Sequence, residues 1–488
     1  MDALNNAVNT AILSLNDAFW SWAVIPLLAV LGVYFTIRSR AVQVRLLPEM
    51  IRNFRGTPEV APDGKKSISS FQAFTISAAS RVGTGNIAGV AIAIALGGPG
   101  AVLWMWIMGL IMASAAFVES TLAQLYKVRD NTGYRGGPAY YMLHGLNARW
   151  MGAVFAVVTI FTFGFVFNMV QANSIAAAVG NSVSTVSATP AGTWVAPVVG
   201  VVLAAITATI IFGGVRRIAH VAQTIVPFMA LIYLVMGAVI VATNIDQVPA
   251  VLSDIVAGAF GIREVGAAGV GTAIMMGIRR GLFSNEAGMG SAPNAAATAS
   301  VSHPVKQGLV QTFGVYFDTL IVCSITAFVI LLSNPVYGEE IGAQLTQRSV
   351  EASLGTWSLH VLTLIILLLA FTSVIGNYYY GESNLEFLTT RPKMLTLYRS
   401  LVVAMVFLGA IGSLDLVWNL ADVTMGTMAV INLIAVAPLS VLAMRLLSDY
   451  QQQRRAGLDP VFTRDRLPGV KGIQCWESSR PALFADRK

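Results

Sequence analysis

The sequence predicts an all-α polytopic membrane protein with eleven transmembrane helices: one N-terminal helix, then two five-helix repeats of opposite orientation. Three observations predict this class. Hydrophobic residues make up 56% of the 488 residues and charged residues 11%, whereas a soluble domain carries about 25% charged residues. The basic residues gather in loops on one side of the predicted spans, and a glycine-rich motif occurs twice.

Eleven apolar segments are long enough to cross a bilayer, which takes about 20 helical residues. They lie at 18–37, 72–97, 100–126, 151–182, 194–213, 217–243, 265–298, 308–333, 357–382, 398–413 and 418–445. The segment 265–298 has the weakest signal, because it contains many glycines and three charged residues, Arg279, Arg280 and Glu286.

Loop charge tests this count. If the loops alternate sides, 26 of the 31 Lys and Arg residues fall in loops on one side, and two, Arg263 and Arg348, on the other. The positive-inside rule then places the N-terminus outside and the C-terminus in the cytoplasm. Omitting segment 265–298 would invert every later loop and scatter the charge, so we expect this segment to cross.

The repeat is visible in the motif SRVGTGN at 80–86, which is echoed by NEAGMGS at 285–291. After the N-terminal helix, five spans precede the second copy and five include or follow it, and because five is odd the second set enters from the opposite side. The predicted organisation is an N-terminal helix with a basic cytoplasmic loop (1–67), a first five-helix repeat (68–245), a second inverted repeat (246–447), and a cytoplasmic tail without a catalytic role (448–488).

Both motifs predict an interrupted helix. A transmembrane helix unwinds only where its freed N–H and C=O groups face protein, solute or ion, and paired interruptions in inverted halves indicate a transporter's binding site. The alternative is close helix packing through Gly85 and Gly89, which form a G-x-x-x-G pattern. Arg81 and Asn86 flank these glycines and favour the interruption.

Arg81 and Glu286 occupy equivalent repeat positions with opposite charge. A buried ion needs a partner, so one hypothesis pairs them across the repeats, in a gating or structural role, or has each anchor its own interrupted segment. The alternative hypothesis is local pairing, with these candidates: Glu119 or Asp422 for Arg81, and Arg279 or Arg280 for Glu286.

Two further carboxylates, Glu119 and Asp318, lie in the second span of each half. Intramembrane carboxylates can relay protons. For Glu119, close to a predicted cytoplasmic end, a structural salt bridge or helix-end solvation is favoured. Asp318 lies deeper, and its gating or structural role is left open.

Other functional classes fit less well. An enzyme would need clustered His, Asp or Cys residues, but the four histidines and two cysteines are scattered, so no organic cofactor is expected. The net charge of +7 is explained by orientation, and no nucleic-acid partner is expected. A channel would favour rings of charge or carbonyls around a symmetric pore, against which the inverted repeat argues.

Five motifs carry a resemblance to a known family: GTGNIAGVA (83–91), GGPGA (97–101), RGGPAYYM (135–142), GLFSNEAGMGSAPNAAA (281–297) and NYYYGE (377–382). Together they resemble the alanine or glycine:cation symporter family over nearly the whole chain. The resemblance implies a LeuT-type five-plus-five inverted repeat with an extra N-terminal helix. It also implies import of small neutral amino acids by alternating access with Na⁺, or alternatively H⁺, in a bacterial inner membrane. A monomer is one option for its assembly.

The resemblance also implies site residues. In this fold the interrupted stretch of the first repeat binds the substrate carboxylate, here Thr84 and Gly85 with Asn86 beside them, and Gln171 lines the pocket. The interrupted stretch of the second repeat receives the ammonium group, here near Phe283, Ser284 and Asn285.

For Na⁺, the resemblance implies the backbone carbonyls of Ala79 and Val82 and the hydroxyls of Thr372 and Ser373. Two adjacent hydroxyls in an apolar helix can instead bond to their own helix, which is the alternative.

One position departs from the family. Many members have tryptophan after the glycine where this chain has Asn377 after Gly376. Asparagine is smaller and polar, so we expect a pocket that admits substrates beyond glycine and alanine, such as serine or glutamine.

Overall fold

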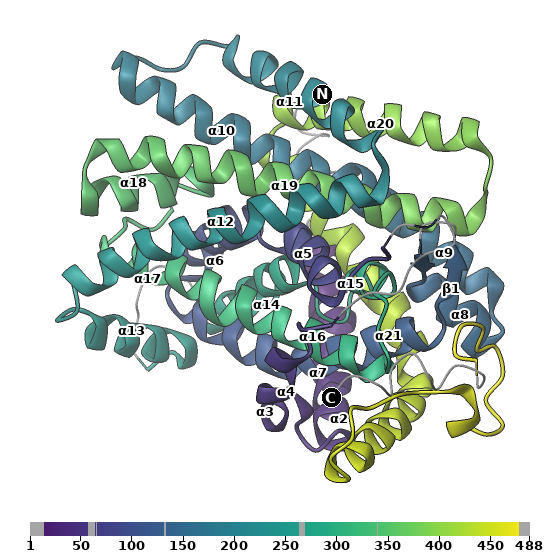
Figure 1. The fold of residues 1–488 in the computed structure, drawn as a ribbon. Coiled ribbons are helices and arrows are strands. Elements are labelled where there is room, and N and C mark those ends of the chain that lie inside the picture. The colour runs from purple at the N-terminus through teal and green to yellow at the C-terminus, as the bar shows by residue number, and fades with distance from the viewer. Residues whose placement is uncertain are drawn as a thin grey trace.

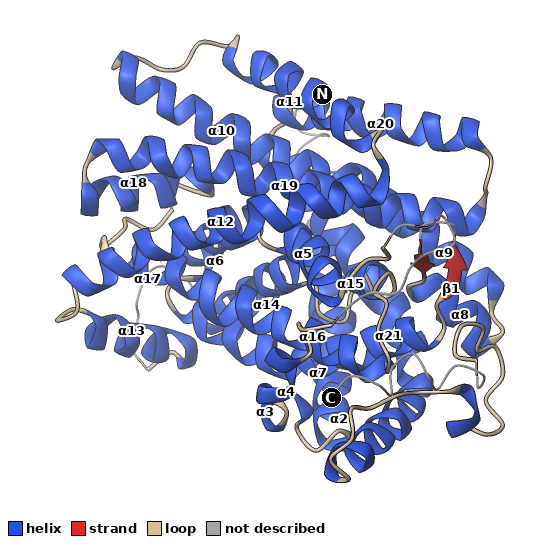
Figure 2. Ribbon diagram, viewed as in Figure 1, coloured by secondary structure: helices blue, strands red, loops and turns tan. Residues whose placement is uncertain are grey.

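The computed structural model describes residues 14–56, 64, 66–130, 133–262, 269–338 and 340–477. These residues are almost entirely helical, with one two-stranded hairpin (Figures 1 and 2). The first residues of the predicted N-terminal region (1–13), Arg263 and the end of the predicted tail (478–488) lie outside the described residues.

Within the described part, eight helices are long and apolar enough to cross a membrane: Ser14–Arg38, Gly100–Leu125, Arg149–Ser187, Arg217–Thr243, Pro304–Leu332, Thr356–Leu388, Pro392–Ile411 and Leu414–Arg455. A ninth candidate is the pair Ser70–Arg81 and Gly85–Gly97, bent by 48° at a short break. The prediction of an all-helical polytopic membrane protein is therefore confirmed, while the count of eleven and the inverted repeat stay predictions.

The two remaining predicted spans are also helical. The first is α11 (Val195–Ile211), a shorter apolar helix. The second, which corresponds to segment 265–298, consists of α14 (Val270–Asn285), a non-helical stretch and the short α15 (Ala292–Ala296). Its polar and glycine-rich composition explains why hydropathy alone does not identify it.

The long helices form two packed groups (Figure 1). In one, α7 (Gly100–Leu125) packs against α14, α16 (Pro304–Val315) and α2 (Ile25–Arg38). In the other, α10 (Phe167–Ser187) packs against α19 (Thr356–Leu388) and α20 (Pro392–Ile411), and α11 covers α20.

Two long helices join these groups. Helix α12 (Gly214–Thr243) contacts α19 of one group and α5 (Ser70–Arg81), whose continuation α6 (Val90–Gly97) packs on α14 of the other. Helix α21 (Leu414–Arg455) contacts both α7 and α10, and it continues beyond the predicted domain boundary at residue 447. The predicted domain boundaries stay predictions.

Four π-helical stretches widen the described spans: η1 (Trp20–Val24), η2 (Gly85–Gly89), η3 (Ile160–Val166) and η4 (Tyr316–Cys323). Such stretches are rare and frequently occur at functional sites. Three of them coincide with the predicted site: η2 follows the first glycine motif, η3 leads into the helix that carries Gln171, and η4 contains Asp318. The helices that carry the predicted site residues therefore depart from regular α-helical geometry at η2, η3 and η4.

A search for spans misses the shorter elements, because they lack an 18-residue apolar run. These elements are α3 (Val42–Arg45), α4 (Leu47–Arg52), the hairpin β1 (Val128–Asp130) and β2 (Gly133–Arg135), α8 (Pro138–Leu146), α13 (Val248–Phe260), α18 (Ala343–Leu354) and η5 (Arg464–Arg466). The remaining helices, α9 (Arg149–Thr159) and α17 (Ser324–Leu332), extend spans already described.

The described part of the tail is folded back onto the spans. The Phe462 N–H donates to the Ser302 carbonyl at 2.8 Å. The indole N–H of Trp476 donates to the Gln124 carbonyl at 3.1 Å, and Trp476 is buried. The tail thus covers one end of α7 and of α16.

Candidate substrate and ion site

The first glycine motif interrupts its helix as predicted: α5 ends at Arg81 and helix resumes at η2. The Gly83 N–H donates to Asn86 Oδ1 at 3.0 Å and the Thr84 N–H to Gln171 Oε1 at 3.1 Å. In a continuous helix these groups would donate four residues back, to Ala79 and Ser80. The interruption therefore leaves those two carbonyls without their usual helical donors.

Gln171 reaches this break from α10, the facing helix of the other group. Its Oε1 accepts from the Thr84 hydroxyl at 2.8 Å as well as from the Thr84 N–H. A Cβ added to Gly83 would meet the Ser373 hydroxyl and would lie 3.0 Å from Gln171 Oε1. Only glycine allows the unwound backbone to approach these two side chains so closely.

The second motif also interrupts its helix, but one residue later than predicted. Phe283, Ser284 and Asn285 are the last turn of α14, and the Glu286 N–H still closes that turn by donating to the Leu282 carbonyl at 2.9 Å. The non-helical stretch begins at Glu286 (φ 57°) and includes Gly288 (φ 85°) and Gly290 (φ 80°). The prediction of an unwound stretch near residues 283–285 is therefore wrong by one residue.

The last turn of α14 nevertheless offers free carbonyls, as every helix C-terminus does. The Ala287 N–H donates to Asn285 Oδ1 at 3.0 Å, and the Gly288 N–H donates to Glu119 Oε1 at 3.1 Å. Neither N–H group donates to the carbonyl four residues earlier in the chain, so the carbonyls of Phe283 and Ser284 lack these helical donors. Free carbonyls at the negative end of a helix dipole suit a cation or an ammonium group.

The helix ends that border the two interruptions, Gly85 at the start of η2 and the last turn of α14, touch each other. A Cβ added to Gly85 would lie 3.0 Å from Phe283 Cδ1 and 3.1 Å from Ser284 Cα. The Phe283 ring packs against Phe167 (ring centroids 4.5 Å apart) and Trp418 (4.8 Å). The structure thus brings the predicted carboxylate-binding and ammonium-binding stretches together beside an aromatic cluster.

Glu119 holds the second interruption in place. Its carboxylate accepts from the N–H groups of Gly288 and Gly290, each at 3.1 Å, and from Asn432 Nδ2 at 2.8 Å. Asn432 also donates to the Gly288 carbonyl at 2.8 Å and accepts from the Tyr141 hydroxyl. The salt bridge or helix-end solvation favoured for Glu119 is therefore wrong among the described residues: the carboxylate is fully buried and binds two backbone N–H groups and Asn432 instead.

Asp318 connects both interruptions from η4. Its Oδ1 accepts from Asn86 Nδ2 at 2.7 Å and from the Ser284 hydroxyl at 3.0 Å. Its Oδ2 accepts from the Thr319 hydroxyl at 3.1 Å, and Thr319 in turn accepts from Asn285 Nδ2 at 3.0 Å. Asp318 is fully buried, and within the described residues no basic nitrogen lies within 4.0 Å of it.

The four residues predicted for Na⁺ are all buried. The hydroxyls of Thr372 and Ser373 donate to the Leu369 carbonyl at 2.8 and 3.1 Å, as the alternative predicted. A donating hydroxyl keeps its oxygen lone pairs, so this bond is compatible with a cation. The Ala79 carbonyl has lost its helical donor, and Ser373 lies against Gly83 on the same segment.

Arg81 and Glu286 do not form the hypothesised ion pair. Arg81 Nη1 donates to the Gln311 carbonyl at 3.3 Å, and among the described residues its Nε and Nη2 have no hydrogen-bond partner. Glu286 accepts from the hydroxyls of Ser80 at 2.5 Å and Ser291 at 2.7 Å.

The alternative local pairs are also absent among the described residues. Arg280 instead pairs with Asp422, and Arg279 with Asp17 at 2.8 Å and Asp422 at 3.8 Å. Glu286 is thus bound by neutral hydroxyls, whereas Arg81 keeps one carbonyl partner and two nitrogens without a partner among the described residues.

Asn377 lies beside this second cluster. Its Oδ1 is 2.6 Å from the Ser80 hydroxyl, the same hydroxyl that contacts Glu286. The side chain is fully buried, and its Nδ2 has no partner among the described residues. The predicted substrate and ion residues are all buried, so the centre is closed around them. Four cavities of about 50 to 440 Å³ are lined by other described residues.

Two interrupted helices whose ends meet at the closed centre of a bundle of apolar spans define a class, the secondary transporters with discontinuous helices. The model of the sodium:alanine symporter family matches residues 5–464. This chain belongs to that family, and it is a transporter rather than an enzyme.

Curated relatives cover most of the chain. The probable sodium/glutamine symporter GlnT of Bacillus subtilis is 51% identical over 95% of this chain and 95% of its own. The amino-acid carrier protein AlsT of the same organism is 50% identical over 95% and 97%, and the sodium/alanine symporter AgcS of Methanococcus maripaludis is 38% identical over 88% and 94%. Among solved structures, the nucleobase-cation-symport-1 transporter Mhp1 aligns at 14% identity with a TM-score of 0.45, which is too low to bear on the fold.

Proposed function

We propose that this chain imports small neutral amino acids together with Na⁺, with alanine and glycine as substrates and serine or glutamine in addition. Family membership supports sodium-coupled amino-acid symport, and relatives at 38–51% identity are named for alanine and glutamine. The observation that carries the proposal is the contact between the helix ends that border the two interruptions, Gly85 on one side and Phe283–Ser284 on the other. We place the protein in a bacterial inner membrane, with the N-terminus outside.

The carboxylate of the substrate binds to the unwound N–H groups around Thr84, Gly85 and Asn86. In the closed centre the amide oxygen of Gln171 already accepts from the Thr84 N–H and hydroxyl. A substrate carboxylate presents the same kind of acceptor with a full charge, and bonds to charged acceptors are stronger. Substrate binding therefore displaces the Gln171 oxygen from Thr84.

The ammonium group binds to the carbonyls of Phe283 and Ser284, with Asn285 beside them. Na⁺ binds to the carbonyls of Ala79 and Val82 and the hydroxyls of Thr372 and Ser373. Both ligands use backbone groups of the same interrupted segment, so each raises the affinity of the other by linkage. Arg81, Glu286 and Asp318 hold the interrupted segments in position.

Proton coupling is the second candidate function, and Asp318 favours it. A fully buried carboxylate with no basic nitrogen within 4.0 Å among the described residues is costly in its charged form. Such a group can take up and release a proton as its surroundings open.

Reconstitution in liposomes tests both candidates. Labelled alanine, glycine, serine and glutamine are offered under an inward Na⁺ gradient, an inward H⁺ gradient, or neither. We expect saturable uptake with Na⁺ that disappears when Na⁺ is removed. Uptake with H⁺ alone would replace Na⁺ by H⁺ as the coupling ion, and rapid equilibration without a gradient would indicate a channel.

The Gln171→Met variant refines this test. It removes the amide oxygen and keeps the side-chain length, so the Thr84 N–H has lost its protein acceptor. We expect a several-fold change in KM for the amino acid and an unchanged half-saturating Na⁺ concentration at saturating substrate. An unchanged KM would contradict the role assigned to Gln171.

The substrate range depends on Asn377 in our proposal. We expect Asn377→Trp to reduce uptake of serine and glutamine relative to alanine and glycine, because indole fills space at the side-chain end of the pocket. Competition assays against labelled alanine measure this range. Asn377→Gln, which adds only one methylene, serves as the control, and an unchanged range in the tryptophan variant would contradict the role.

A further inference from the structure

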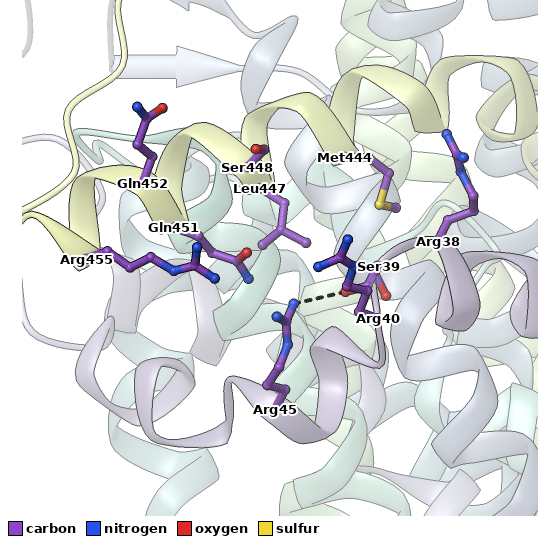
Figure 3. A pocket seen from close by; sticks show the side chains of 10 residues that line it. All are labelled: Arg38, Ser39, Arg40, Arg45, Met444, Leu447, Ser448, Gln451, Gln452 and Arg455. Carbon is purple, nitrogen blue, oxygen red and sulfur yellow. Dashed lines mark hydrogen bonds between the residues drawn. The ribbon is translucent and has the colours of Figure 1, made fainter.

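A cavity of about 440 Å³ lies between the end of the first span and the end of the last, away from the two interruptions (Figure 3). Four arginines lie around it over two apolar side chains: Arg38, Arg40, Arg45 and Arg455, with Met444 and Leu447. The four arginines are exposed at the rim, whereas Leu447 is buried. The cavity thus has a basic rim and a partly apolar wall.

None of these four arginines has an acidic partner within 4.0 Å among the described residues. Two arginines close by in sequence, Arg52 and Arg454, do have an acidic partner, because both pair with Glu49. Arg45 Nη2 donates to the Ser39 carbonyl at 3.2 Å, the dashed line in Figure 3. Gln451 also lines the cavity, and its buried Nε2 has no hydrogen-bond partner among the described residues. It therefore offers many hydrogen-bond donors and few acceptors.

The backbone adopts an unfavourable conformation to form this rim. Arg40 and Ala41 have φ angles of 55° and 53°, in the left-handed region that is unfavourable for a residue with a side chain. The turn is held by the Ala41 N–H, which donates to the Thr36 carbonyl at 2.7 Å. Two such residues in succession turn the chain sharply after α2 and bring Arg38, Arg40 and Arg45 to one cavity. Such outliers point to a functional constraint.

The surface beside the cavity is apolar. On α4, Leu47 and Ile51 are 41% and 57% exposed, and their spacing of four places them on one helical face. Val44 on the preceding α3 is 65% exposed. Ile37 on α2 and Val441 on α21 are 70% and 45% exposed. Short helices with an apolar face outward and basic residues beside it lie in the membrane interface. A basic cavity beside exposed apolar side chains is the pattern expected where a protein meets lipid headgroups.

We propose that this cavity binds the phosphate headgroup of an anionic phospholipid. The guanidinium groups donate to the phosphate oxygens in the bidentate geometry that arginine favours. The acyl chains lie along Ile37 and Val441. Basic pockets between transmembrane helices recognise anionic lipids in this way. The orientation rule alone explains basic residues in this loop, but it does not require unpaired arginines around a cavity.

The purified full-length chain in a neutral detergent tests this. Its thermal midpoint is followed while phosphatidylglycerol, phosphatidylcholine or inorganic phosphate is added, because a ligand of the folded state raises that midpoint. We expect phosphatidylglycerol to raise it saturably and phosphatidylcholine and phosphate to have little effect. Stabilisation by inorganic phosphate at equal concentration would replace the lipid by a free anion and overturn the proposal.

A matched pair of double variants locates the site. In Arg40→Gln/Arg455→Gln we expect an affinity for phosphatidylglycerol roughly thirtyfold lower, since each arginine near a membrane surface contributes about fivefold. Arg391→Gln/Lys393→Gln removes the same charge from exposed positions elsewhere and should bind like the wild type. Equal losses in both double variants, or a loss in neither, would overturn the proposal. Lipid binding is measured without transport, so this outcome is independent of the proposed symport.

Discussion

Uptake falls roughly 5- to 150-fold in Gly83→Ala, the range expected from about 1–3 kcal/mol of overpacking. The added methyl would meet the Ser373 hydroxyl and lie 3.0 Å from Gln171 Oε1. It would push apart the unwound segment and the two helices that face it. Initial rates of alanine uptake into liposomes measure the effect, and thermal midpoints of the purified variants show whether folding is preserved.

Gly89→Ala is the matched control on the same segment. Its methyl would have ordinary contacts, 3.6 Å from Trp418 Cη2 and 3.8 Å from the Thr84 carbonyl, so we expect uptake close to the wild type. If these glycines served helix packing through Gly85 and Gly89, the control variant would be the damaged one. If uptake tolerates Gly83→Ala but not Gly89→Ala, the result would support close helix packing rather than a helix interruption.

Asp318→Ala is expected to reduce Na⁺-driven uptake roughly 10- to 150-fold, because hydrogen bonds to charged groups contribute about 1.5–3 kcal/mol. The change removes the side chain that accepts from both Asn86 and Ser284. Both interruptions then lose a shared anchor. Initial uptake rates and the half-saturating Na⁺ concentration measure the result.

Asp318→Asn separates anchoring from proton chemistry. Its amide oxygen can still accept from Asn86 or Ser284, so an anchoring role predicts partial activity with Na⁺. A proton-coupling role predicts the loss of H⁺-driven uptake in the same variant. Asp415→Asn, at an exposed position in the first turn of α21, is the control. Normal uptake by Asp318→Ala under both gradients would contradict either role.

The first interruption could be predicted because it is a local feature of the chain. Glycines, Asn86 and Arg81 within an apolar segment have few explanations, and the freed N–H groups at Gly83 and Thr84 follow from them. The second interruption is displaced by one residue because Glu286 adopts φ 57° after a completed helical turn. A left-handed residue that is not glycine leaves no signal in the composition of its neighbours.

The partners of the buried charges could not be predicted from spacing along the chain. Repeat equivalence suggests a pair of Arg81 and Glu286, yet Glu286 accepts from two neutral side chains, Ser80 across the bundle and Ser291 nearby in sequence. The contact of Asn377 with Ser80 could not be predicted either, because it depends on how α19 packs against α5. Packing between distant segments decides such contacts, and one sequence contains no record of it.

Glu119 has a consequence for how the centre can open. Its carboxylate joins three segments, α7, the stretch after α14 and, through Asn432, α21. Separating them would break several bonds to a buried charge, each worth about 1.5–3 kcal/mol. We therefore expect these three segments to move together when the centre opens, and the uncharged Thr84–Gln171 contacts with α10 to be the ones that break.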